Sequence, residues 1–340
     1  MTLPALARTE IAGDVAAAVA RVPAGPGVGQ VLGPDGRSLV IGPASSLRRW
    51  AASNLGMGKP PAPGRRPKTN LAPVATALSW VETDGPFLQR LVFERLMAPL
   101  VPLASRRDLK PPAFLLLDEA ERFPRVALRA RDADRAKLFG PFRDRRAAER
   151  ARDAVHGRFP LRPCDYVFEP HPELPLGLSC VFAQVRTCAA PCLARTSEAD
   201  YRAIASRAAA WLAGPREGGD ATTEVPPLVG RAAGARAVIV DAGRRRAALF
   251  PVLGGRVIDS SALAVEPGGI DGALAALRWD APADGPDDWP WLLAWMRTAR
   301  ARAAFAPVAA DEPVEALRER VRAALPARFG DNVGRARGQG

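Results

Sequence analysis

All four cysteines of this 340-residue chain fall within one stretch, from Phe159 to Leu212. They are Cys164, Cys180, Cys188 and Cys192, separated by fifteen, seven and three residues. Thiolates are soft ligands, and their gathering in a chain without a recognisable secretory signal favours a metal or a cluster over a disulfide framework. The uneven spacing, without paired Cys-x-x-Cys knuckles, favours an iron–sulfur cluster, because the chain must wrap around a larger body than one metal ion. Zinc and reduced, buried core thiols remain the alternatives.

The residues around these cysteines resemble a bacterial DNA-repair family, the UvrC excinucleases and their shorter relatives, the Cho endonucleases. The similarity rests on Phe-Pro-Leu-Arg ahead of Cys164, on the Cys-x7-Cys-x3-Cys run with Pro191 before its last cysteine, and on a helix expected to open at Ser197 with Tyr201. Members of the family carry an iron–sulfur cluster on these cysteines. The resemblance therefore implies a 4Fe–4S cluster on the four cysteines of this chain.

The net charge of +12 indicates a polyanionic partner, because neutralising phosphates releases counterions and drives binding. Only four of the 48 basic residues are lysine, and such an arginine bias is also typical of a GC-rich genome. The distribution is more specific, since sixteen Arg and Lys accompany nine Asp and Glu between Ser105 and Pro163. This region predicts a DNA-binding surface, with a solvated basic face as the alternative.

A basic helix is expected over residues 144–157, within that region. The candidate DNA-binding residues are Arg48, Arg49, Arg143, Arg145, Arg146 and Arg150. Arginine forks bind phosphate bidentately, so these side chains are suited to following a DNA backbone. The alternative is that they form the solvated side of amphipathic helices.

Arg8, Glu10 and Asp14 interrupt the apolar N-terminal stretch, which argues against a signal peptide. No run approaches the roughly twenty apolar residues that cross a bilayer. We therefore expect a cytoplasmic protein with no membrane partner.

The patterns predict an α+β chain of small domains. We expect a helix at 9–21, a β-hairpin from strands at 28–32 and 38–41, a helix from about 45, a strand at 77–81 and a helix at 86–97 capped by Asp84. A small antiparallel sheet is expected at 236–260, followed by helices at 269–278, 287–304 and 312–325. The expected divisions are an N-terminal helix (1–24), a small mixed domain (25–104), a basic connecting region (105–163), a cysteine-rich helical segment (164–212), a linker (213–227), a small α+β C-terminal domain (228–327) and a disordered tail (328–340).

The order of hairpin, helix, strand and helix resembles the GIY-YIG nuclease domain that precedes the cysteines in the same family. Most catalytic positions are substituted: Gly29 and Val40 stand where the family has tyrosines, Pro43 where it has lysine and Trp50 where it has arginine. In the family's chemistry a tyrosine or its activated water transfers protons, a glutamate holds Mg²⁺ and basic side chains offset developing charge. The glutamate alone is retained, as Glu94, which is either a residual metal ligand or a structural helix carboxylate.

These observations favour an excision-repair protein that keeps the family fold, the cluster segment and the basic surface around a substituted nuclease site. The expected partners are DNA and the excision-repair loading proteins, such as one like UvrB. One alternative is an active Mg²⁺-dependent endonuclease that uses Glu94. The other is an iron–sulfur structural module that does not act on DNA.

Overall fold

The computed structural model describes residues 5–58, 69–102, 105–129, 135–142, 144–172, 180–213, 231–244, 246–258, 263–265, 269–279, 287–296, 304–308 and 314–325. Three antiparallel sheets follow one another along the chain, each with helices packed on it, so the predicted α+β class is confirmed. Nearly all of the expected linker at 213–227 and the whole of the expected tail at 328–340 lie outside the described residues. No helix in the described ranges combines the length and the apolar composition needed to cross a membrane.

The first sheet has the strand order β1-β4-β2-β3 and forms a lobe of its own with two helices. Its elements are β1 (Ala7–Glu10), α1 (Val15–Arg21), β2 (Gly27–Leu32), β3 (Ser38–Ala44), α2 (Leu47–Asn54) and β4 (Ala77–Glu82). The hairpin of β2 and β3, the helix near residue 45 and strand β4 match the sequence predictions. The expected helix at 9–21 was wrong in its first part. Ala7–Glu10 pair with β4, and Asp14 accepts the N–H of Ala17 to begin α1.

Helix α3 (Pro86–Met97) has the bounds that the sequence predicted and lies between the first and third sheets. Asp84 does not cap it, contrary to our expectation. The carboxylate of Asp241, on the third sheet, accepts the N–H groups of Phe87 and Leu88 at 3.0 and 2.8 Å. Near its other end, Arg95 donates to both oxygens of the buried Asp288. Both ends of α3 are therefore bound to residues that come far later in the chain.

The second sheet, in the order β6-β5-β7, carries the cysteine segment. It consists of β5 (Ala113–Leu117), β6 (Val126–Arg129) and β7 (Leu138–Phe142), with α4 (Arg145–Arg158), the short α5 (Val181–Gln184) and α6 (Glu198–Ala213) following. Alanines of α4 and α6 and the fully buried Tyr201 pack against the phenylalanines of this sheet. Small side chains on both helices allow them to lie close together over one core.

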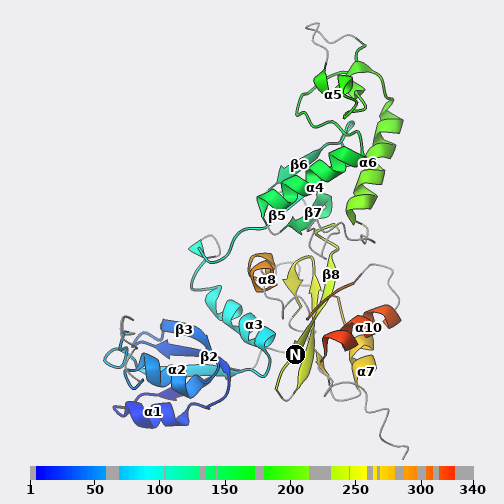
Figure 1. Ribbon diagram of the computed structural model, residues 1–340. Helices are drawn as coiled ribbons and strands as arrows, with labels where there is room; N and C mark the ends of the chain where they lie inside the picture. The colour runs from blue at the N-terminus through cyan, green and yellow to red at the C-terminus, as the bar shows by residue number, and fades with distance from the viewer. Residues whose placement is uncertain are drawn as a thin grey trace, which may run out of the picture.

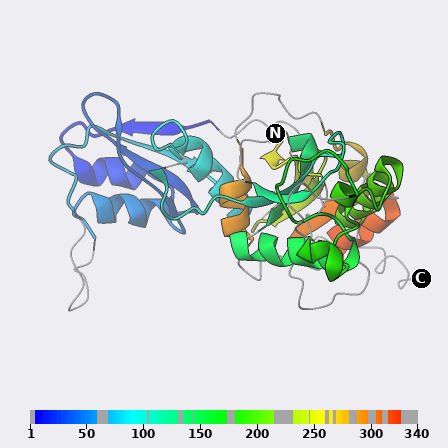
Figure 2. The same ribbon diagram turned by 90° about the horizontal axis from the view of Figure 1, so that it is seen from above.

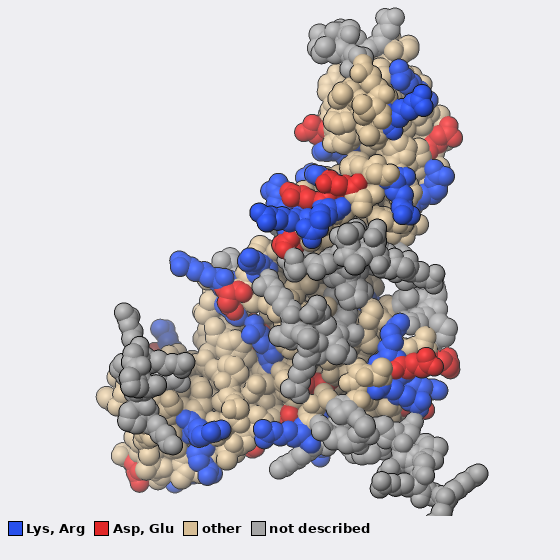
Figure 3. Space-filling model, viewed as in Figure 1, with Lys and Arg blue, Asp and Glu red and all other residues tan. Residues whose placement is uncertain are grey.

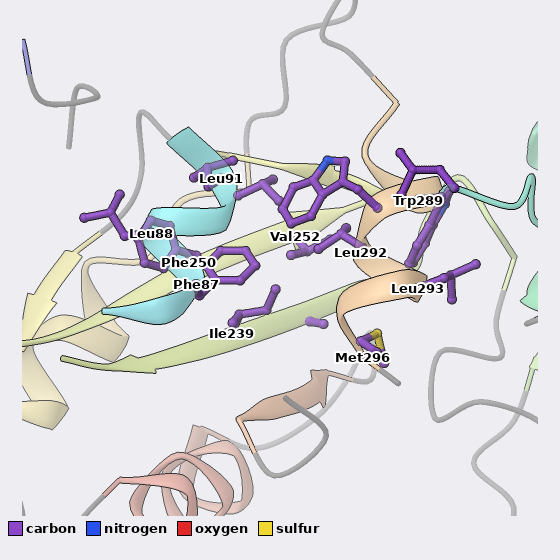
Figure 4. Close-up of a cluster of buried hydrophobic side chains, with 14 of the residues drawn as sticks. Phe87, Leu88, Leu91, Ile239, Phe250, Val252, Trp289, Leu292, Leu293 and Met296 are labelled. Carbon is purple, nitrogen blue, oxygen red and sulfur yellow. The ribbon is translucent and has the colours of Figure 1, made fainter. Parts of the chain in front are cut away.

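The third sheet, in the order β10-β9-β8-β12 with β11 beside β9, is covered on both faces. Its elements are β8 (Arg236–Ala242), β9 (Ala247–Leu253), β10 (Arg256–Val257), β11 (Leu263–Val265), α7 (Ile270–Ala275), α8 (Trp289–Trp295), β12 (Phe305–Val308) and α10 (Val314–Ala324). Val238 and Val240 face α7 and α10, whereas Ala237 and Ile239 face α3 and α8, as the two-residue period of a strand requires. Figure 4 shows Phe87 and Leu91 of α3 packed against Phe250 and α8.

Candidate functional site: a cysteine loop and a substituted nuclease site

The four cysteines lie in the segment between α4 and α6, which we call the cysteine loop. Hydrogen bonds at its start hold this loop to the second sheet. The backbone N–H of Arg162 donates to the hydroxyl of Tyr201 at 2.7 Å, and that hydroxyl donates to the carbonyl of Pro124 at 3.2 Å. The guanidinium of Arg162 also donates to the carbonyls of Phe123 and Tyr166 at 2.9 and 2.8 Å. These contacts place Cys164 directly beyond a fixed point of the core.

The four thiols lie within electrostatic reach of one another. Cys188 and Cys192 are buried and Cys164 and Cys180 are partly exposed. Burial raises the pKa of the Cys188 thiol to about 11, and the other three cysteines add smaller contributions to that rise. Burial also raises the pKa of Cys192, with further contributions from Cys180 and Cys164. Burial and the neighbouring cysteines therefore both disfavour the thiolate forms of Cys188 and Cys192, and a bound cation would favour them.

The backbone around Cys188 and Cys192 turns repeatedly through the left-handed region. Arg186, Ala190 and Ala194 have φ values of 57°, 51° and 53°, a conformation that costs residues with a side chain about 1–2 kcal/mol each. The N–H of Ala190 donates to the sulfur of Cys188 at 3.3 Å. Left-handed residues turn backbone N–H groups inward, and such concavities are common at phosphate and iron–sulfur sites.

The donor chemistry of the loop therefore fits a group held by thiolates. Its four sulfurs suit an iron–sulfur cluster or a zinc ion, and the N–H to sulfur bond is the kind that tunes a cluster. Among the described residues, no three His, Cys, Asp or Glu side chains are already arranged as a metal site. The cluster on Cys164, Cys180, Cys188 and Cys192 thus stays a prediction.

Trp50 covers the strand positions where the family's first tyrosine would stand. Gly29 lies opposite Gly42 across the β2–β3 pair. A Cβ atom added at Gly29 would lie 2.5 Å from the Trp50 ring, and one added at Gly42 would lie 3.2 Å from the indole nitrogen. The indole of α2 thus lies against two glycines whose lack of a side chain makes room for it.

The five family positions do not converge on one point of the sheet. Val31, Leu78 and Trp50 pack on the face covered by α1 and α2, and Val40 joins them. Val28 and Val81 pack on the opposite face with α3, which carries Glu94. Pro43 is exposed on the edge strand β3. Trp50 and Glu94 therefore lie on opposite sides of the first sheet.

Glu94 is buried and both of its carboxylate oxygens accept from arginines. Arg106 donates to Oε2 at 3.0 Å and to Oε1 at 3.3 Å, and Arg90 lies 2.5 Å from Oε1. The Glu94 side chain is 4% exposed. A divalent metal would have to displace these cations, so the residues present do not fit the Mg²⁺ that the family resemblance implies at this glutamate.

The candidate DNA-binding arginines lie on two separate helices. Arg48 and Arg49 are exposed on α2, and the Nε of Arg48 donates to the carbonyl of Val22 at 2.8 Å. On α4, Arg145, Arg146 and Arg150 are exposed, and Arg145 pairs with Glu149. Arg143 lies outside the described residues. Figure 1 shows α2 and α4 well apart, so these residues form two patches.

The patch on α4 combines basic and acidic side chains. Figure 3 shows Lys and Arg gathered over the second sheet, with a few acidic residues among them. Within the part of the chain that the structure describes, Arg146 and Arg150 make no ion pair with Asp or Glu. Both side chains are exposed and can donate to a phosphate without first losing a carboxylate.

Three residues important to these sites were missed by the sequence analysis. Arg106 resembles any other surface arginine in a basic stretch, and only its approach to α3 reveals its burial. Asp241 and Asp288 act on α3 from more than 150 residues away, so no local pattern signals their roles. No such signal existed for these three residues. The position of Trp50 did have one, because Gly29 and Gly42 lie opposite each other in a hairpin and leave space for a large ring.

Comparison with known proteins identifies the region that contains the cysteine loop. Residues 113–211, from β5 to α6, match the UvrC/Cho excinuclease middle domain. The second sheet, its helices and the loop between them are therefore similar to an excinuclease middle domain. The resemblance to UvrC/Cho proteins that the sequence suggested is confirmed over this region.

Three relatives extend the similarity beyond that domain. Proteins named UvrABC system protein C are 29% identical over 199 residues in Gluconobacter oxydans, 31% over 198 in Sphingopyxis alaskensis and 30% over 191 in Novosphingobium aromaticivorans. The matched regions cover 58%, 58% and 56% of this chain but only 30%, 30% and 28% of the respective relatives. The chain thus spans less than a third of the length of the curated relatives it matches. No solved structure matches it.

Proposed function

We propose that the chain is a nucleotide excision repair protein that binds DNA through its basic surface and does not cut it efficiently. The observation that carries this proposal is the filled nuclease site. Trp50 lies over Gly29, and arginines neutralise the one retained carboxylate, Glu94. Phosphodiester hydrolysis needs a group that moves protons and a metal or cation that stabilises the developing charge. The side chains at these positions supply neither.

The cysteine loop is proposed to hold a 4Fe–4S cluster on Cys164, Cys180, Cys188 and Cys192. A bound cluster would supply the positive charge that lets four neighbouring thiols ionise and would connect the loop across α5 to the start of α6. The support is the donor set, the inward N–H of Ala190 and the left-handed residues on either side of it. Zinc is the alternative, and the metal content of anaerobically purified protein distinguishes the two.

The proposed partners are DNA and a loading protein of the excision-repair system. Support for a DNA partner comes from the net charge of +12 and from Arg146 and Arg150. Support for the loading protein comes from the relatives, which are named as components of the UvrABC system. We place the DNA contact on the α4 side, beside the cysteine loop.

The first experiment measures both binding and incision with the full chain. A lesion-bearing duplex is offered with Mg²⁺ or Mn²⁺, alone and with the loading proteins. We expect binding that weakens steeply with salt and no incision above background. Incision that is lost in Glu94→Ala would show that the protein is an active endonuclease. DNA binding that is absent, or that does not change with salt, would favour a structural module that does not act on DNA.

Arginine variants then locate the contact surface. Arg146→Gln with Arg150→Gln is expected to lower the slope of log affinity against log salt by about 2, because each phosphate contact contributes about 0.9. The matched control replaces Arg8 and Arg37, which are exposed on the first sheet, and should leave that slope unchanged. An equal effect of both pairs would mean that binding follows overall charge and uses no defined surface.

A further inference from the structure

Arg106 lies between two carboxylates that come from different segments. Its Nη1 and Nη2 donate to the two oxygens of Glu94, on α3, at 3.0 and 3.3 Å. Its Nε and Nη2 donate to the two oxygens of Asp108 at 2.9 and 2.8 Å. One guanidinium therefore engages both oxygens of two acidic side chains, which is the strongest geometry available to arginine.

The surroundings keep this cation in place and charged. Arg106 and Glu94 are 7% and 4% exposed, and the ring of Phe93 lies 5.8 Å from the guanidinium carbon of Arg106 and 5.6 Å from that of Arg90. The hydrogen bond to Asp108 raises the pKa of Arg106 further above its ordinary range. The same hydrogen bond lowers the pKa of Asp108. The guanidinium therefore stays charged at any pH at which the protein is folded, and Asp108 stays ionised to a lower pH than an ordinary aspartate.

Two carboxylates that converge on one point are also what a hard divalent cation requires. Mg²⁺ binds carboxylate oxygens at about 2.0–2.1 Å, typically through one or two carboxylates, and keeps several waters. Here the space between Glu94 and Asp108 is filled by a planar group that is covalently attached to the chain and cannot dissociate. Removing it would leave two carboxylates facing each other with the single positive charge of Arg90 beside Glu94, so the group would keep a net negative charge that favours another cation.

We infer that Arg106 takes the place of a divalent metal ion: its guanidinium bridges Glu94 and Asp108, offsets their charge together with Arg90, excludes the metal from Glu94, and would leave a divalent-cation site if a small neutral residue replaced it. This inference rests on the proposed function and names the group that keeps the nuclease site from binding metal. It also makes the fold around α3 independent of divalent cations.

The test measures Mn²⁺ binding and thermal unfolding of the full chain, without DNA. Mn²⁺ is the probe because its bound and free forms differ in electron paramagnetic resonance. In wild type we expect no Mn²⁺ binding that depends on Glu94, and the same Tm in Mn²⁺ and in EDTA. Arg106→Ala should lose stability in EDTA, bind one Mn²⁺ per chain and recover part of its Tm when Mn²⁺ is added.

Two controls make the result specific. Arg107→Ala removes an exposed arginine next in the chain and should behave as wild type in every respect. Glu94→Gln added to Arg106→Ala should weaken Mn²⁺ binding by about 10-fold or more, because a charged ligand is lost. If Arg106→Ala does not fold, Arg106→Met fills more of the space beside Phe93 with an uncharged side chain and carries the same measurements.

Two outcomes would overturn the inference. Mn²⁺ binding in wild type that Glu94→Gln removes would show that the metal coexists with Arg106. A folded variant without Arg106 that ignores Mn²⁺ would show that the two carboxylates do not form a cation site. The second result would leave the proposed DNA binding without cutting intact, whereas Glu94-dependent incision by wild type would end both proposals.

Discussion

The first sheet and the cysteine loop resemble the UvrC/Cho proteins in different respects, the first in its fold and the second in its donor groups. The first sheet has strands, helices and a core, and two of its positions of interest already have partners within the protein: Arg106 and Arg90 pair with Glu94, and the Trp50 ring lies over Gly29. The cysteine loop has little regular structure, with one helical turn in α5 and a 3₁₀ turn at Pro191–Leu193. Its four cysteines nevertheless contribute to one another's electrostatics, and the backbone N–H of Ala190 is directed at the sulfur of Cys188.

This difference shows that a fold and the chemistry of its site depend on different residues. A fold persists while its apolar positions do, because burial dominates stability. A binding site persists only while its donors remain unsatisfied within the protein and so need an external partner. By that criterion the cysteine loop has donors that a bound group could still engage, whereas in the first sheet Gly29 is packed against Trp50 and Glu94 is paired with arginines.

The largest expected effect tests the cysteine side of this comparison. Cys188→Ser replaces a soft thiolate by a hydroxyl of similar size, so we expect loss of essentially all bound iron and of the visible absorption of a cluster. Ala189→Ser places the same hydroxyl one residue away and should keep the full iron content. Iron and sulfide analysis of anaerobically purified proteins is the measurement. Full iron in the Cys188→Ser protein would remove the cluster assignment.

Glu94→Ala tests whether this carboxylate stabilises the fold. It removes the buried carboxylate that pairs with both Arg106 and Arg90, so we expect a loss of about 3–5 kcal/mol in the free energy of unfolding. Glu82→Ala, at an exposed position of β4, should change it by no more than about 0.5 kcal/mol. Denaturant titration of both variants provides the comparison. Equal, small effects would mean that Glu94 is free to serve another role.

Gly29→Ala tests the contact between Trp50 and the hairpin. The new Cβ would overlap the ring, so we expect a loss of about 1–3 kcal/mol. Most of this loss should disappear in a Trp50→Ala background, because the ring is then absent. Gly157→Ala, where nothing lies within 4 Å of the added atom, is the matched control and should be neutral or slightly stabilising. A loss that is the same with and without Trp50 would point to backbone strain.

The smallest effect concerns pH and arises at His156, near the end of α4. Burial lowers the pKa of His156 below its ordinary value of 6.5, and its ring lies 3.2 Å from the carbonyl of Leu161. The unfolded chain therefore binds a proton that the folded chain resists, so stability is full above pH 6.5 and falls as the pH drops below it. His156→Gln should flatten this decline in Tm. The exposed His171→Gln should leave it unchanged, and a larger effect at His171 would contradict the prediction.

Local features of the fold could be predicted from sequence because local residues determine them. The bounds of α3 follow from Gly85 and Pro86 at its start and from its apolar spacing. The alternation in β8 and β9 likewise predicted a sheet. Strand β1 could not be predicted, because Ala7–Glu10 has no alternating pattern and is a strand only by pairing with β4. The cap of α3 was assigned to the wrong aspartate for the same reason.

The candidate sites divide in the same way. The four thiols could be identified because cysteine is rare in this chain and its chemistry is specific. The environment of Glu94 could not, since its burial depends on how α3 meets the segment that carries Arg106. Sequence therefore predicts which donors a chain possesses, and the structure decides whether those donors already have partners.

The position of α3 also has a consequence for how the protein is made. Phe87 and the aspartate that caps its helix are 154 residues apart. At a synthesis rate of roughly 5–20 residues per second, α3 leaves the ribosome about 8–30 seconds before β8 does. During that interval the face formed by Phe87, Leu88 and Leu91 has no partner from the third sheet. The nascent chain thus exposes an apolar surface that only the last third of its own sequence can cover, so a ribosome stalled before residue 236 would release a product suited to chaperone binding or degradation.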